Sequence, residues 1–257
     1  MSFNYHPLQG LTIALTRPLK RSEELRASLE ARGAEVHSLP TIDIRYLCPE
    51  MPEGFEERVT SNNLRSLALV STEATRAFHR YLSTSYPNTQ IPAWNHIFAL
   101  GDKTLKALKD LNFKGINFHR AMPSNDVGLA EIIRTNLNKN EPMIAPRGSK
   151  ARTRWSEELI YEGFNIDRPL VYETRDATRA KAACPSRLDW ALFFSPSAAE
   201  AWTRLYPRIE VNACAVIGHT TAETCRQLGF NVEVVASTPA EEVLVGELEA
   251  YVSVTRT

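Results

Sequence analysis

An internal duplication constrains the fold of this chain more than any other feature of its sequence. Residues 11–44 align without gaps with residues 141–174. In both copies a short apolar segment is followed by a basic turn, an amphipathic helix and a glycine suited to ending that helix. The identical positions include an arginine and a glycine in each copy: Arg17 with Arg147, and Gly33 with Gly163.

Two further pairs of segments repeat in the same order. Residues 66–82 resemble 190–206, and residues 97–113 resemble 214–230. The identities again fall after apolar segments: Ser71 with Ser195, Gly101 with Gly218, and Thr104 with Thr221. Because every repeated segment alternates strand and helix, the pattern predicts an α/β protein with parallel sheets covered by helices on both faces.

The size and charge of the chain limit the classes of function. A length of 257 residues with 43% hydrophobic residues is enough for two modest cores. Thirty basic residues balance thirty acidic ones, so we expect no nucleic-acid partner, although a locally basic pocket could still bind a small anion. No apolar run approaches the roughly 18 residues of a membrane span, and no signal peptide is apparent, so we expect a cytoplasmic protein without a membrane partner.

Motifs for common cofactors and nucleophiles are absent. The chain lacks GxGxxG, GxxxxGK[ST], GxSxG and HExxH patterns. Its six histidines are scattered, and none of its four cysteines forms a CxxC pair. We therefore expect no metal and no cofactor, and reduced thiols at Cys48, Cys184, Cys214 and Cys225.

Polar residues directly after the apolar strands are the candidates for ligand binding. In an open parallel sheet, ligands bind outside the carboxyl ends of the strands, where free helix N–H groups suit carboxylates or phosphates. The candidates are Thr16, Arg17, Ser71, Thr72, Gly101, Asp102, Lys103, Thr104, Arg147, Gly148, Ser195, Pro196, Ser197, Gly218, His219, Thr220 and Thr221. An alternative is that the hydroxyls only cap helices and the glycines only permit tight turns.

The chemistry of these candidates favours binding with a single proton donor. Asp102 is the only clear carboxylate among them, so catalysis by paired carboxylates is not favoured. The position of His219 is typical of a turn residue as well as of a functional residue. Tyr172 lies in a connector between the copies, where its repeat partner is Ile42. Its phenol could donate a proton to a ligand, or the ring could simply pack at a hinge with its hydroxyl in water.

Several motifs together resemble the uroporphyrinogen-III synthase family. They span most of the chain, from residue 11 to residue 252, and IGHTTAE following FFSPSA is the most specific combination. Two departures are Glu73, where a proline is usual, and His219, where a smaller residue or proline is usual. The motifs are ALTRP (14–18), RGAEV (32–36), LPTIDI (39–44), LVYETR (170–175), FFSPSA (193–198) and VIGHTTAE (216–223).

The resemblance implies an enzyme that closes a linear tetrapyrrole without a cofactor. Hydroxymethylbilane, which carries eight carboxylates, would lose water and cyclise to uroporphyrinogen III with inversion of its last pyrrole ring. By resemblance, Tyr172 assists departure of the hydroxyl group. Hydroxyls and backbone groups at the strand ends would hold the carboxylates, with basic side chains as counter-charges. These are Ser71, Thr104, Ser195, Ser197, Thr221, Gly101 and Gly218, with Arg17, Lys103 and Arg147.

The resemblance also implies an exchange of segments between two similar lobes. The expected lobes are residues 1–44 with 176–257, and residues 45–175. Two hinge strands, at about 42–48 and 171–177, would join them, and the ligand would lie between the lobes. We expect a monomer that contacts the preceding enzyme of the pathway transiently. A rival interpretation is a non-catalytic tetrapyrrole- or anion-sensing module of the same fold, and another is a generic two-lobed ligand-binding protein.

Overall fold

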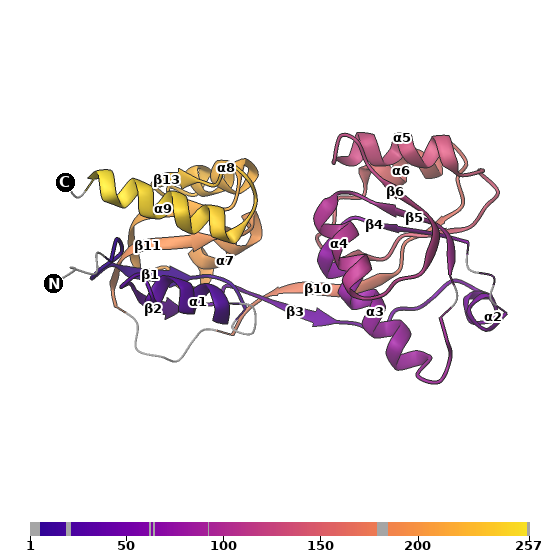
Figure 1. Cartoon of the computed structure of the whole chain (residues 1–257), viewed down its shortest axis with the longest axis horizontal. Coiled ribbons are helices and arrows are strands. Elements are labelled where there is room, and N and C mark those ends of the chain that lie inside the picture. The colour runs from indigo at the N-terminus through magenta and orange to yellow at the C-terminus, as the bar shows by residue number, and fades with distance from the viewer. Residues whose placement is uncertain are drawn as a thin grey trace. The chain divides into compact units, whose positions relative to one another are not determined.

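The chain forms two compact units in a computed structural model (Figure 1). Unit 1 comprises Met1–Asp43 with Arg175–Thr257, and unit 2 comprises Ile44–Thr174. The structure describes residues 6–18, 22–61, 63, 65–91, 93–178 and 185–255. Among the helices in these ranges, none combines the length and the apolar character needed to cross a membrane.

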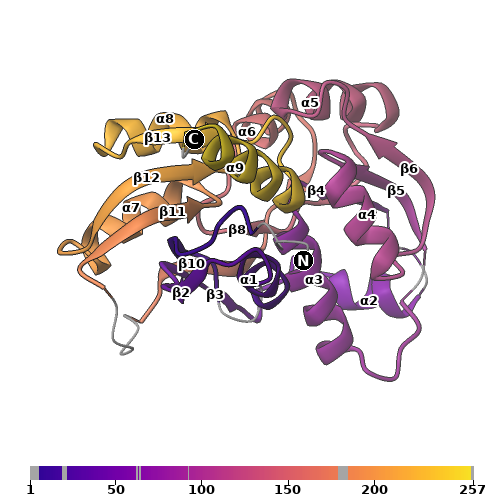
Figure 2. The same cartoon turned by 60° about the vertical axis from the view of Figure 1, so that its left-hand side comes forward.

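Unit 1 is a five-stranded parallel sheet in the order β13-β12-β11-β1-β2. Helices α1 and α9 pack on one face through leucines such as Leu29 and Leu248, and α7 and α8 cover the other through Trp202 and Ala222 (Figure 2). The strands are β1 (Thr12–Leu15), β2 (Glu35–Ser38), β11 (Arg187–Phe193), β12 (Glu210–Val216) and β13 (Val232–Val235). The helices are α1 (Glu23–Glu30), α7 (Pro196–Leu205), α8 (His219–Gln227) and α9 (Glu241–Thr255).

Unit 2 repeats this plan with the strand order β6-β5-β4-β7-β9, again all parallel. Helices α3 and α4 pack on one face through Phe78 and Leu108, and α5 and α6 on the other through Leu129 and Leu159. The strands are β4 (Ser66–Leu69), β5 (Trp94–Ala99), β6 (Gly115–Arg120), β7 (Met143–Ile144) and β9 (Ile166–Asp167). The helices are α2 (Phe55–Thr60), α3 (Thr72–Ser85), α4 (Asp102–Asp110), α5 (Asp126–Asn136) and α6 (Arg154–Tyr161).

The predicted fold class is confirmed, since both units are parallel sheets covered by helices. The central strands are buried on both faces, as β4 illustrates with four buried residues in the sequence SLAL. The two copies of the repeat complete different sheets. Strands β1 and β2 join the strands of residues 187–235, whereas β7 and β9 join those of residues 66–120.

Two paired strands, β3 (Ile42–Tyr46) and β10 (Leu170–Asp176), connect the units, and β8 (Arg147–Gly148) adds to β10. The N–H of Ala177 donates to the carbonyl of Thr41 at 3.0 Å, and the N–H of Leu47 donates to that of Val171 at 2.9 Å. From the first of these hydrogen bonds to the second, the residue number rises along β3 and falls along β10. The two strands are therefore antiparallel. The chain therefore passes between the units twice, along neighbouring strands.

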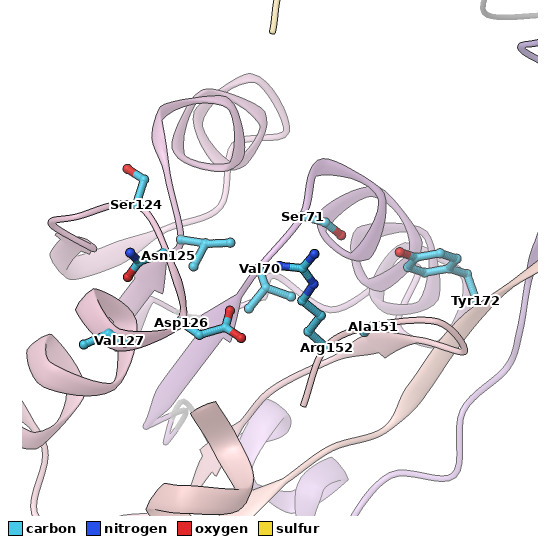
Figure 3. Close-up of a pocket in the computed structure, with 10 residues that line it drawn as sticks. Val70, Ser71, Ser124, Asn125, Asp126, Val127, Ala151, Arg152 and Tyr172 are labelled. Atoms are coloured by element: carbon cyan, nitrogen blue, oxygen red, sulfur yellow. The ribbon is translucent and has the colours of Figure 1, made fainter. Parts of the chain in front are cut away.

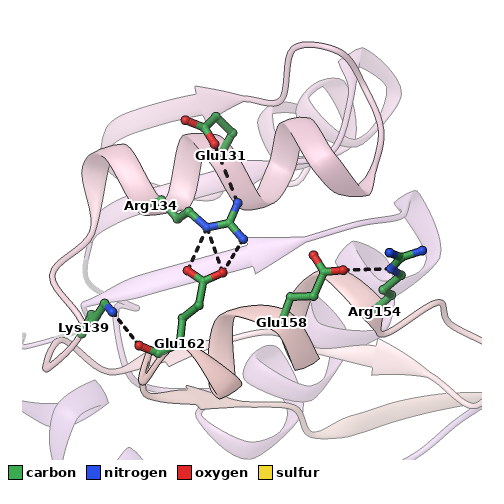
Figure 4. Close-up of polar contacts among 6 residues, drawn as sticks. All are labelled: Glu131, Arg134, Lys139, Arg154, Glu158 and Glu162. Atoms are coloured by element: carbon green, nitrogen blue, oxygen red, sulfur yellow. Dashed lines mark hydrogen bonds and ion pairs between the residues drawn. The ribbon is translucent and has the colours of Figure 1, made fainter.

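Helices α5 and α6 are joined by a network of charged groups centred on Glu162 (Figure 4). The guanidinium of Arg134 donates from Nη2 to Oε1 of Glu162 at 2.5 Å and from Nε to Oε2 at 2.9 Å. Lys139 Nζ donates to the backbone carbonyl of Glu162 at 2.6 Å. Hydrogen bonding from Arg134 holds the pKa of the Glu162 carboxyl below its usual range. Folding therefore favours the charged carboxylate at this position.

We expect Glu162→Gln to lower the Tm at pH 7 and to have progressively less effect in acid. A depressed pKa stabilises the folded state above the unfolded pKa of about 4.3, and this contribution is lost as the pH falls through the folded value. Thermal melts of both proteins between pH 3 and pH 7 measure the difference. Glu158→Gln is the control, because its partner Arg154 is 84% exposed and the effect should be smaller. A Tm difference that stays constant with pH would contradict the prediction.

Candidate functional site

A cavity of about 480 Å³ opens in unit 2 where strands β4 and β5 end (Figure 3). Its walls combine apolar residues that follow these strands with polar side chains from the starts of two helices and from the loop after β8. The residues lining it are Val70, Ser71, Leu100, Ser124, Asn125, Asp126, Val127, Ala151, Arg152 and Tyr172. This is the edge of a parallel sheet at which ligands bind in open α/β folds.

Helices α3 and α5 begin at this cavity with side-chain caps. The Oγ of Ser71 accepts the N–H of Ala74 at 3.1 Å, and the Oδ1 of Asn125 accepts that of Gly128 at 3.0 Å. Gly101 begins α4 without a side-chain cap, and a Cβ there would lie 3.4 Å from that of Ser124. Backbone N–H groups at the starts of these helices suit a bound carboxylate.

Charged side chains in the cavity come from Arg152 and Asp126. The side chains of Arg152, Asp126 and Tyr172 extend into the same space (Figure 3). A guanidinium can bind a carboxylate through two parallel hydrogen bonds. Sequence reasoning missed Arg152 because it follows β8 by four positions rather than directly. The basic run of residues 147–152 was the available signal.

Tyr172 is the predicted proton donor, and it lines the same cavity as Ser71. It belongs to β10 and pairs in register with Gly148 of β8. The N–H of Ser149 donates to the Tyr172 carbonyl at 3.0 Å, and the Oγ of Ser149 accepts the N–H of Thr174 at 3.1 Å. The backbone on both sides of Tyr172 is therefore held by the loop that follows β8.

Other predicted residues of unit 2 lie near the cavity without lining it. Thr72 is the first residue of α3, Lys103 is exposed in the first turn of α4, and Thr104 is buried there. Arg147 is half-buried and lines a separate small void of about 10 Å³ together with Arg152 and Arg168. Its Nε is buried without a hydrogen-bond partner among the described residues.

In unit 1 the predicted hydroxyls gather at the ends of β11 and β12. The Oγ of Ser195 accepts the N–H of Ala198 at 3.2 Å and lies 3.1 Å from the Oγ of Ser197. Gly218 begins α8, in whose first turn Thr220 is exposed and Thr221 is buried. Ser195, Gly218 and Thr221 occupy the positions in the duplication that Ser71, Gly101 and Thr104 occupy in unit 2.

Two predicted residues of unit 1 make contacts within their own unit. Arg17 forms an ion pair with Glu241, and its guanidinium lies 5.0 Å from the centre of the Phe194 ring. Thr16, which is predicted to bind the ligand, has its own contact in the core of unit 1. It is fully buried, and its Oγ1 donates to the Leu192 carbonyl at 2.6 Å. At the end of a central strand this side chain points into the core, so it holds β1 to β11.

The described part of the chain holds no group of three or more His, Cys, Asp or Glu residues arranged to bind a metal. Cys48 is exposed, and Cys214 and Cys225 are buried, all as free thiols. Burial raises the pKa of Cys225 to about 12 and also raises that of Cys214, so both are packed as inert thiols. Cys184 lies outside the described residues.

The fold and the site together define a two-unit α/β protein with a cavity at a sheet edge, lined by an arginine, an aspartate and the starts of two helices. The chain matches the family described as uroporphyrinogen-III synthase HemD over residues 23–246. The chain therefore belongs to the uroporphyrinogen-III synthase family.

Individual relatives agree with this family. The chain is 22% identical over 257 residues to the porphyrin biosynthesis protein HemD of Ruminiclostridium josui, covering 96% of the chain and 50% of the relative. The chain thus spans about half the length of this curated relative.

Two solved structures share the fold. A mutant uroporphyrinogen III synthase of the extremely thermophilic bacterium Thermus thermophilus has a TM-score of 0.60 at 14% identity and covers 96% of this chain and 100% of its own. Uroporphyrinogen-III synthetase from Helicobacter pylori has a TM-score of 0.61 at 16% identity, and it covers 94% of this chain and 99% of its own.

Proposed function

We propose that this chain is a uroporphyrinogen-III synthase that converts hydroxymethylbilane to uroporphyrinogen III. The observation that carries the proposal is the unit 2 cavity, where the Tyr172 phenol, the Arg152 guanidinium and helix N-termini meet in a member of this family. The substrate is a polycarboxylate, and this cavity supplies groups that bind carboxylates beside one group that can donate a proton.

The first step breaks the bond between the terminal carbon and its hydroxyl oxygen. The pyrrole nitrogen of the first ring supplies the electron pair, and Tyr172 gives a proton to the departing oxygen, which leaves as water. The electrophilic azafulvene is then attacked by the substituted carbon of the last ring, giving a spiro intermediate before inversion. The enzyme contributes mainly by holding the chain in the conformation that allows this attack.

The remaining strand-end residues are proposed to bind acetate and propionate groups through hydroxyls, backbone N–H groups and positive charge. This role is proposed for Ser71, Thr72, Gly101, Lys103, Thr104, Arg147, Ser195, Ser197, Gly218, Thr220, Thr221 and Arg17. Helix starts recur at most of these positions in both units, and the backbone N–H groups of a first helical turn suit a bound carboxylate.

The proposal is tested by the isomer that the protein produces. Freshly made hydroxymethylbilane is incubated with the protein, the products are oxidised, and the uroporphyrin isomers are separated. We expect type III to predominate. Formation of type I alone, the product of spontaneous closure, would reject the enzyme and favour the rival interpretation, a non-catalytic tetrapyrrole- or anion-sensing module of the same fold.

Arg152→Gln is expected to raise KM for hydroxymethylbilane by about 10-fold or more, with a smaller change in kcat. A charged hydrogen bond to a carboxylate contributes about 1.5–3 kcal/mol, and the loss falls mainly on binding when the bond is present throughout the reaction. Steady-state kinetics measure both constants. Arg154→Gln is the matched control, since Arg154 is exposed on α6 and pairs with Glu158. Equal KM values for the two variants would exclude Arg152 from the binding site.

We further propose that the protein acts in the cytoplasm as a monomer and meets the preceding enzyme of the pathway only transiently. The free thiols of Cys48, Cys214 and Cys225 are compatible with a reducing compartment. Light scattering after gel filtration tests the monomer, and a dimeric mass would reject it.

A further inference from the structure

The ring of Tyr172 fills the space that a side chain at position 148 would need. A Cβ built on Gly148 would lie 2.3 Å from Cζ of Tyr172, 2.6 Å from its Cε2 and 2.6 Å from its hydroxyl oxygen. Real Cβ atoms essentially never approach other atoms this closely. All three atoms lie at the hydroxyl end of the ring. A side chain at position 148 would therefore displace the phenol oxygen more than the end of the ring that is attached to Cβ.

The backbone of Gly148 does not itself require glycine. Its φ lies outside the left-handed region, unlike that of Gly33 or Gly163. Gly148 is buried in β8, and it is paired in register with Tyr172 of the neighbouring strand β10. Alanine could therefore adopt this conformation, and the contact with the Tyr172 ring is the constraint that excludes it.

The duplication supplies a second argument. In the first copy the positions of Gly148 and Tyr172 are occupied by Pro18 and Ile42. The glycine thus occurs in the copy that carries the tyrosine and is replaced by a larger residue in the copy that lacks it. This pairing agrees with a glycine kept to make room for the phenol.

We propose that Gly148 is a positioning residue that fixes the Tyr172 hydroxyl in the unit 2 cavity, an inference that rests on the proposed function. It acts through Tyr172 and not by contact with substrate. A shift of about 1 Å in a reacting group can cost about 100-fold in rate. Gly148→Ala is therefore expected to lower kcat for type III formation by about 100-fold, with KM changed far less.

A double-mutant cycle separates this role from general damage to the fold. In a Tyr172→Ala background the space beside position 148 is empty, so adding Gly148→Ala should reduce neither kcat nor Tm further. In the wild-type background the same substitution should reduce both. Gly246→Ala is the matched control, because a Cβ there meets nothing within 4 Å and activity should be unchanged.

Two outcomes would overturn the inference. One is a Gly148→Ala variant that keeps its kcat within about twofold, a change too small for a displaced proton donor. The other is an equal drop in Tm in both backgrounds, which would mean that Gly148 does not act through the Tyr172 side chain. The Tm measurements of the double-mutant cycle need no substrate. They therefore test the contact between position 148 and Tyr172 even if the wild-type protein yields only type I product and the proposed function itself fails.

Discussion

Tyr172→Phe is expected to lower kcat for type III formation by about 100- to 10,000-fold, the range that general acid catalysis contributes. Phenylalanine keeps the ring that lies against Gly148 and removes only the hydroxyl, so the packing of β10 on β8 is preserved. KM should change little, because the carboxylate-binding groups are untouched. Steady-state rates with isomer analysis of the product, together with the Tm, provide the measurement.

Tyr161→Phe is the matched control for this prediction. Tyr161 is 93% exposed at the end of α6 and does not line the cavity, so its loss should leave the rate unchanged. If Tyr172→Phe reacted at the wild-type rate, proton donation by the phenol would be excluded. A large drop in Tm would instead indicate that Tyr172 matters for packing.

The fold could be predicted largely because its signals are local and are repeated. A strand such as β1 and its copy β7 are short apolar segments followed by helices with the same periodicity, so one copy supports the interpretation of the other. The two-residue strand β8 could not be predicted in this way. Arg147 and Gly148 form a strand only because β10, more than twenty residues further along the chain, pairs with them.

Part of the cavity lining could be predicted from position in the chain, and part could not. Ser71 follows its strand directly and lines the cavity with Tyr172. Arg152 and Asp126 reach the same cavity from a loop and from the first residue of α5, positions that depend on the packing of α5 and α6. The burial of Thr16 could not be predicted, because the rule for strand ends does not state which way a side chain points.

Phe78→Ala is expected to destabilise unit 2 by about 3–5 kcal/mol, the usual cost of removing a large buried aromatic side chain. Phe78 is fully buried, and its ring centre lies 6.1 Å from that of Trp94 and 6.4 Å from those of Phe55 and Phe113. Hydrogen exchange read by mass spectrometry should show faster exchange in peptides of β4 and β5. Peptides of β11 and β12 should keep their protection, because unit 1 has core clusters of its own.

Trp202→Ala provides the reciprocal experiment. Trp202 is the corresponding buried aromatic of unit 1 and packs 5.8 Å from Phe193 and 5.0 Å from Tyr206, between ring centres. Its loss should speed exchange in β11 and β12 and leave β4 and β5 protected. If either substitution accelerated exchange equally in both units, the two cores would not be independent. If they are independent, Phe78→Ala should reduce activity by unfolding the cavity that holds Tyr172 while unit 1 stays folded.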